Sequence, residues 1–121
     1  MRRGLQGSRN SMRLYVLIRK DLGPAYGAVQ AGHAVAEFVL RCPELWKNNT
    51  LIYLGVDDDK CLRRWGERLD QRGIQWVGFI EPDIGNQMTA IATVCERDIF
   101  RELKKWTGEG HQKHELNARE K

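Results

Sequence analysis

Four hydrogen-bonding side chains recur at helical spacing in one segment of the chain. They are Tyr26, Gln30, His33 and Glu37. Steps of three or four residues place them on one stripe of an α-helix. Glu37 is the only charged residue between positions 22 and 40. Neutral donors and acceptors on a sheltered face suit ligand binding or proton transfer. The alternative is that the stripe is the ordinary solvated face of an amphipathic helix.

An apolar strand and a Gly-Pro break precede this stripe. Residues 14–18 read LYVLI, a run typical of a strand that is buried on both faces. Gly23 and Pro24 then interrupt the chain, and proline suits the first turn of a helix, so we predict a helix over 24–42. Its expected apolar side lies opposite the polar stripe. That side consists of Ala28, Ala31, Val35, Phe38, Val39 and Cys42.

The remaining pattern predicts three further strands and two further helices. Apolar and β-branched runs predict strands at 51–56, 74–80 and 89–95. Amphipathic spacing predicts helices over 60–72 and 96–106. Taken in order, these elements predict an α/β fold with three layers, in which a four-stranded mixed sheet has helices on both faces.

Length and composition indicate one folded domain. The chain has 121 residues, of which 41% are hydrophobic and 30% are charged. The periodic pattern covers 12–106, whereas 1–11 read as a disordered leader and 107–121 as a flexible polar tail. No apolar run approaches the roughly 18 residues of a membrane span, and no signal peptide is evident. We therefore predict a cytoplasmic protein with no membrane partner.

The net charge of +4 arises mostly outside the predicted domain, because 12–106 hold 14 bases against 13 acids. Any nucleic-acid surface must therefore come from local clustering. One such cluster is a basic stripe on the predicted helix 60–72, with a cation at every fourth position. The stripe consists of Lys60, Arg64, Arg68 and Arg72. It is either a solvated face or a surface that faces phosphates.

Two groups of residues raise the question of a metal site. Asp57, Asp58 and Asp59 are consecutive carboxylates, but they lack the alternating ligands, the glycine and the distal Glu of an EF-hand loop. They stand where a helix begins, so we expect them to cap it. His111 and His114 have no further ligands near them in the sequence. We therefore expect neither a metal nor another cofactor.

Two sequence blocks carry a family resemblance. The run RKDL followed by AVQAGHA resembles the signature of type two peptidyl-tRNA hydrolases, the form typical of archaea and eukaryotes. That signature joins an Arg-x-Asp-Leu strand end to Gly-Lys-x-Ala-Ala-Gln-x-x-His-Ala on the first helix. The matching residues are Arg19, Asp21, Leu22, Ala28, Gln30, His33 and Ala34. The family's second block, Asp-Ala-Gly-x-Thr-Gln-Ile, is matched by Thr89, Ile91 and the following Ala92, and the resemblance covers about 95 residues.

The resemblance implies hydrolysis of the ester that joins a peptide to the terminal ribose of tRNA. Such a reaction needs an activated water and a donor for the developing oxyanion. The implied site contains Gln30, which positions water or substrate, His33, which orients the site, and Thr89. The implied acid is Asp83 if the loop is two residues longer than in the family, with Glu81 as the other possibility. A lone helical histidine is also commonly a core residue.

The chain departs from the family at one residue that the chemistry uses. Holding Gln30 and His33 in register puts Tyr26 where the family has its catalytic Lys. A neutral phenol with an ordinary pKa of about 10 replaces a cation there, so we expect weakened or altered hydrolysis. The alternative is a non-catalytic module of the same fold that binds RNA or a protein.

The implied partner is tRNA, and the expected contacts combine a strand end with the basic stripe. These contacts are Arg19, Lys20, Arg64 and Arg68. The sequence leaves the oligomeric state open, with a homodimer as one possibility.

Overall fold

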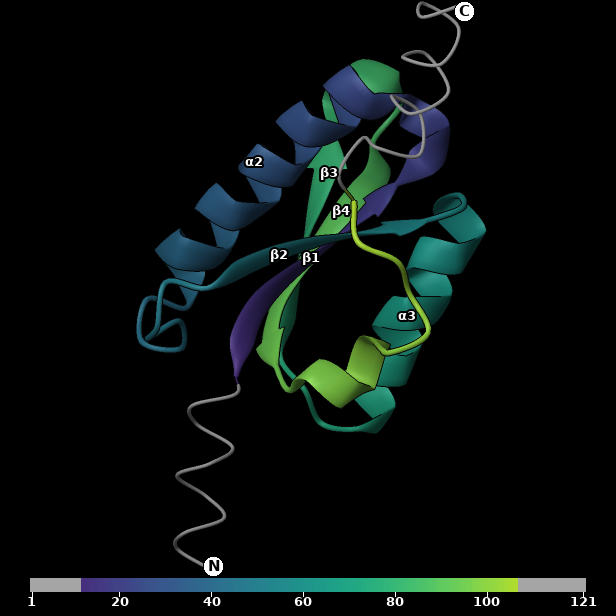
Figure 1. Ribbon diagram of the computed structural model, residues 1–121. Coiled ribbons are helices and arrows are strands. Elements are labelled where there is room, and N and C mark those ends of the chain that lie inside the picture. The colour runs from purple at the N-terminus through teal and green to yellow at the C-terminus, as the bar shows by residue number, and fades with distance from the viewer. Residues whose placement is uncertain (1–11, 107–121) are drawn as a thin grey trace, which may run out of the picture.

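The protein is described by a computed structural model in which residues 12–106 are placed (Figure 1). Four strands form one mixed sheet in the order β2-β1-β4-β3. Their bounds are β1 Arg13–Arg19, β2 Leu51–Val56, β3 Trp76–Glu81 and β4 Gln87–Cys95. Strands β1 and β2 run parallel, whereas β4 is antiparallel to both of its neighbours, β1 and β3. The predicted four-stranded mixed sheet is confirmed.

Two helices cover opposite faces of the sheet, which gives the three predicted layers. Helix α2 (Pro24–Arg41) lies on one face and α3 (Asp59–Gln71) on the other (Figure 1). Side chains of β1 alternate between the two cores: Val16 packs with Phe38 of α2, and Leu17 packs with Leu62 of α3. The apolar run predicted to be buried on both faces is therefore buried as expected.

Three strand ends meet at one edge of the sheet. Because β3 and β1 are both antiparallel to β4, they run in the same direction, and β2 is parallel to β1. The carboxyl ends of all three strands therefore lie at the same edge. In open α/β sheets this edge is the usual place for ligand binding. Both α2 and α3 start there, each shortly after the strand that precedes it.

The three consecutive aspartates act at the start of α3, as predicted. Asp58 is the N-cap residue, and its carboxylate accepts a hydrogen bond of 2.9 Å from the backbone N–H of Cys61. Its neighbours form ion pairs, Asp57 with Lys20 at 3.4 Å and Asp59 with Arg63 at 2.8 Å. The carboxylates therefore serve three different partners.

The predicted helix over 96–106 is wrong. The structure has a short 3-10 helix, η3 (Arg97–Phe100), and then an extended segment that pairs with the outer edge of β2. In this segment the carbonyl of Lys104 accepts from Gly55 N–H at 3.1 Å, and Trp106 N–H donates to the carbonyl of Tyr53 at 2.6 Å. A single helix cannot form because its apolar residues are divided between the two cores: Phe100 packs on the α3 side and Trp106 on the α2 side.

The apolar side of α2 is predicted correctly at Ala31, Val35, Phe38 and Cys42, which pack in the core, and wrongly at two positions. Ala28 and Val39 were expected in the core, but both are exposed. The buried side of α2 consists of Gly27, Gln30, Ala31, Ala34 and Phe38. The polar stripe therefore lies at the margin of the buried side and not opposite to it, because Gln30 belongs to both.

Several expectations fall on parts of the chain that the structure leaves undescribed. The predicted disordered leader at 1–11 and polar tail at 107–121, with His111 and His114, lie outside the described residues. Between residues 12 and 106, the structure has no helix with the length and apolar character that a membrane crossing requires.

Two glycines of α2 give a matched test of this packing. A Cβ at Gly27 would lie 2.8 Å from the ring of Trp106, whereas a Cβ at Gly32 would meet nothing within 4 Å. Gly32→Ala is expected to raise the free energy of unfolding by about 0.5–1 kcal/mol, since alanine is the better helix former. Gly27→Ala is expected to lower it by about 1–3 kcal/mol through overpacking. Urea denaturation measures both, and equal stabilisation by both changes would contradict the packing of Trp106 against α2.

Candidate active site

The carboxamide of Gln30 lies at the centre of a buried hydrogen-bond network. Its Nε2 donates to Oε1 of Glu81 at 2.9 Å, and its Oε1 accepts from the hydroxyl of Thr89 at 2.6 Å. The exposed fractions of these side chains are small, 1% for Gln30, 8% for Glu81 and 0% for Thr89. The network joins α2, the end of β3 and the start of β4, which are far apart in the sequence.

A β-bulge directs the hydroxyl of Thr89 toward α2. Phe79 pairs with Ala90, but the next residue, Ile80, pairs with Met88, so the register shifts by one at Thr89. Met88 packs in the α3-side core and Ala90 in the α2-side core. Strict alternation would send Thr89 to the α3 side, and the bulge instead allows its hydroxyl to reach Gln30.

Glu81 is held by three groups at the end of β3. Besides the bond from Gln30, its second carboxylate oxygen accepts from the backbone N–H of Asp83 at 3.1 Å, and its carbonyl accepts from Asn86 N–H at 3.0 Å. The hydrogen bonds from Gln30 and from the Asp83 backbone lower the pKa of Glu81, with a smaller contribution from nearby His33. Glu81 is therefore an oriented carboxylate that is ionised at neutral pH.

Two side chains of α2, Tyr26 and His33, lie near enough to Glu81 to interact with its charge. Desolvation and the negative charges of Glu81 and Asp83 raise the pKa of the half-buried Tyr26 phenol, which keeps it protonated and able to donate. His33 is exposed and stacks on Phe79, with ring centroids 4.5 Å apart and an interplanar angle of 14°. The site thus combines a fixed carboxylate with a neutral hydroxyl donor.

The predicted residues Tyr26, Gln30, His33 and Thr89 are brought together in this site. The two candidate acids differ in position. Glu81 contacts Gln30 directly, whereas the side chain of Asp83 is exposed and only its backbone N–H joins the network. Sequence reasoning missed Phe79 as the support of His33. The sequence feature that could have pointed to Phe79 is its position two residues before Glu81 in the same strand.

Arg19 forms a structural clamp beside this network. Its guanidinium makes a bidentate ion pair with Asp21 at 2.8 and 3.0 Å, and it also donates to Gln87 Oε1 at 2.8 Å and to the carbonyl of Met88 at 3.2 Å. The hydrogen bond from Arg19 lowers the pKa of Asp21. Only 6% of Arg19 is exposed, so its surroundings give no support to the prediction that it contacts nucleic acid. It fixes the start of β4 instead.

The other three predicted nucleic-acid contacts line one cavity on the α3 side of the carboxyl edge. Lys20, Arg64 and Arg68 surround a cavity of about 380 Å³ together with Lys104. Two acids, Asp57 and Glu102, also line it, so the cations outnumber the acids among the lining residues. Arg68 lies 4.7 Å from the centroid of the Trp65 ring, and Lys20 pairs with Asp57, so Lys20 does not fill the place of the absent family Lys.

Comparison with protein-family models gives no match, and comparison with curated proteins gives none. A solved structure is similar, that of a protein of unknown function from Agrobacterium tumefaciens strain C58. It has a TM-score of 0.59 and 15% sequence identity, and the match covers 78% of this chain and 97% of that chain. The likeness shows a shared α/β fold and carries no information about activity.

The lowered pKa of Glu81 predicts a pH-dependent contribution to stability. The ionised form is favoured in the folded chain, so its stabilisation is complete above the ordinary value of 4.5 and is lost as the pH falls through the lower folded-state pKa. Glu81→Gln is therefore expected to be less stable than the unchanged protein at pH 7, and the difference should shrink toward pH 3. Urea unfolding across this range measures the effect. A difference that stays constant with pH would contradict it.

Proposed function

We propose that this protein hydrolyses the ester bond of peptidyl-tRNA slowly, releasing peptide and free tRNA. The observation that supports this proposal is the Thr89–Gln30–Glu81 network with Tyr26 one helical turn away, since it gathers the residues that the family resemblance marks. Cytoplasmic location and tRNA as partner are parts of the same proposal.

In the proposed reaction Glu81 acts as the general base. Its carboxylate takes a proton from a water, the water oxygen forms a bond to the ester carbonyl carbon, and the Tyr26 hydroxyl donates a hydrogen bond to the resulting oxyanion. When the tetrahedral intermediate collapses, the bond to the ribose oxygen breaks and the proton passes from Glu81 to that leaving oxygen. Gln30 and Thr89 are too buried to touch substrate, so they act by orienting Glu81.

Slow turnover follows from two features of the site. The pKa of Glu81 is lowered, which makes it a weaker base. The phenol of Tyr26 is neutral, and a neutral donor stabilises an oxyanion less than an ammonium group does. Phosphates of the RNA would bind at the Lys20, Arg64 and Arg68 cavity, which lies on the other side of the same sheet edge and so away from the charge of Glu81.

The catalytic assignment is tested by release of free tRNA from peptidyl-tRNA. Glu81→Gln is expected to reduce kcat by about two to four orders of magnitude, since the base is lost. Tyr26→Phe is expected to reduce it, and Tyr26→Lys to raise it by restoring a charged donor. Unchanged release by Glu81→Gln would contradict the role of Glu81.

Two threonines of β4 provide a matched control for these measurements. Thr89 and Thr93 are both fully buried, and each donates a hydrogen bond of 2.6 Å, Thr89 to Gln30 and Thr93 to the carbonyl of Gln75. Replacing either with Val should cost about 1–3 kcal/mol of unfolding free energy because a buried acceptor loses its donor. Only Thr89→Val should also lower kcat, because only Thr89 supports the Glu81 network.

The RNA contacts are tested by the salt dependence of tRNA binding. A Lys20→Ala, Arg64→Ala double variant is expected to weaken binding and to reduce the slope of log Kd against log salt by about one to two, since two phosphate contacts are lost. Arg63→Ala is the control, because Arg63 lies on the same helix but pairs with Asp59 outside this cavity. Equal losses in both variants would contradict a local site.

A second candidate function is RNA binding without turnover. It is favoured by Tyr26, because the family Lys is absent at that position. It predicts salt-sensitive tRNA binding with no release of free tRNA at high protein concentration, and no gain from Tyr26→Lys. The two measurements described above therefore separate the two functions.

A further inference from the structure

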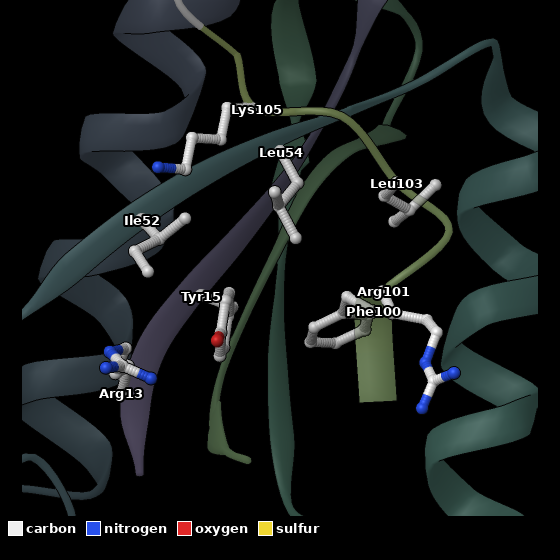
Figure 2. A pocket seen from close by; sticks show the side chains of 8 residues that line it. All are labelled: Arg13, Tyr15, Ile52, Leu54, Phe100, Arg101, Leu103 and Lys105. Atoms are coloured by element: carbon white, nitrogen blue, oxygen red, sulfur yellow. The ribbon is translucent and has the colours of Figure 1, made fainter. Parts of the chain in front are cut away.

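A second cavity lies at the other end of the sheet from the candidate active site. It has a volume of about 390 Å³ and opens between β1, β2 and the segment 100–105 (Figure 2). Its β1 residues, Arg13 and Tyr15, stand at the start of the strand, whereas Arg19 ends it. Six residues of strand span about 20 Å, so Arg13 and Tyr15 lie far from the Glu81 site, whereas Leu103 lines both this cavity and the cavity near Lys20.

The floor of the cavity is apolar and largely aromatic. Tyr15 and Phe100 meet edge to face, with ring centroids 5.2 Å apart and an interplanar angle of 64°. Both rings and the neighbouring Leu54 are at least 96% buried. Trp65 of α3 packs against Phe100 from behind, with centroids 5.1 Å apart. The floor is therefore rigid, because its rings belong to the packed core on the α3 side of the sheet.

The charged residues that line the cavity, among those that the structure describes, are all cations, and they stand at its margin. Arg13, Arg101 and Lys105 stand around the apolar floor, and Figure 2 shows them at the periphery with Tyr15 and Phe100 between them. Arg101 and Lys105 are exposed, and no acid of residues 12–106 forms an ion pair with either. The cavity near Lys20 differs in this respect, since Asp57 and Glu102 offset part of its charge.

We propose that this cavity binds a small aromatic anion, meaning a flat apolar body that bears a carboxylate or a phosphate. Its volume is in the range of pockets that enclose small ligands. The apolar floor favours an apolar body, because contact with it removes apolar surface from water. Positive charge beside low-dielectric walls favours an anion, and the guanidinium of Arg101 can hold a carboxylate or phosphate through two hydrogen bonds.

An NMR titration of the full chain tests this proposal, with 1-naphthyl phosphate and 1-naphthoate as the probes. Inorganic phosphate has the charge without the body, and 1-naphthol has the body without the charge. At least one naphthyl anion is expected to bind at least about tenfold more tightly than either control. The shifted backbone amides should be those of Tyr15, Leu54, Phe100 and their neighbours. The affinity difference between the two anions identifies the preferred acidic group.

Two sets of variants separate a local site from general charge attraction. The Arg101→Glu, Lys105→Glu double variant is expected to weaken binding about tenfold or more, whereas Lys60→Glu, Arg63→Glu makes the same change in net charge away from the cavity and should leave the affinity unchanged. Leu103→Trp keeps the cations, fills the cavity and should also abolish binding of the naphthyl anions. Thermal unfolding of each variant checks that it is folded.

Three results would overturn the proposal. One is inorganic phosphate binding as tightly as the naphthyl anions, which would leave no role for the aromatic floor. Another is a set of shifts centred on Lys20 and Arg64, which would mean that the anion occupies the other cavity. The last is equal loss of affinity in the two charge-reversed variants, which would reduce the effect to net charge.

Discussion

The two hydrogen bonds of the Gln30 carboxamide constrain three elements at once. A buried amide that lacks partners costs about 1–3 kcal/mol for each missing bond, so α2 must turn its polar residue toward Glu81 and Thr89. The same requirement places the bulge of β4 at Thr89, because regular alternation would direct that hydroxyl to the other core. The conformation of the candidate site is therefore a consequence of satisfying one side chain.

The sheet edge separates two regions of opposite charge. Strands β1, β2 and β3 end at this edge, where Glu81 lies on the α2 side and the cavity of Lys20 and Arg64 lies on the α3 side. Arg19 stands between them and is neutralised by Asp21, so it fixes the backbone of β4 without adding free charge to either region.

Features that depend on neighbouring residues in the chain could be predicted from the sequence. The buried run of β1, the start of α2 at Pro24 and the cap of α3 at Asp58 are of this kind. Features set by distant contacts could not. The rotation of α2 depends on a threonine 59 residues away, the extended segment 104–106 depends on the edge of β2, and the choice of Glu81 over Asp83 as the partner of Gln30 depends on loop conformation.

The extended segment that ends at Trp106 protects the sheet as well as completing its packing. It occupies the N–H of Gly55 and the carbonyl of Tyr53, which are backbone groups on the outer edge of β2. Proteolytic cleavage just before residue 104, with loss of the segment that follows, would expose this edge and the space beside Gly27 that the Trp106 ring fills. Exposed strand edges recruit strands from other molecules, so a clipped form would be prone to self-association even with every residue of the candidate active site intact.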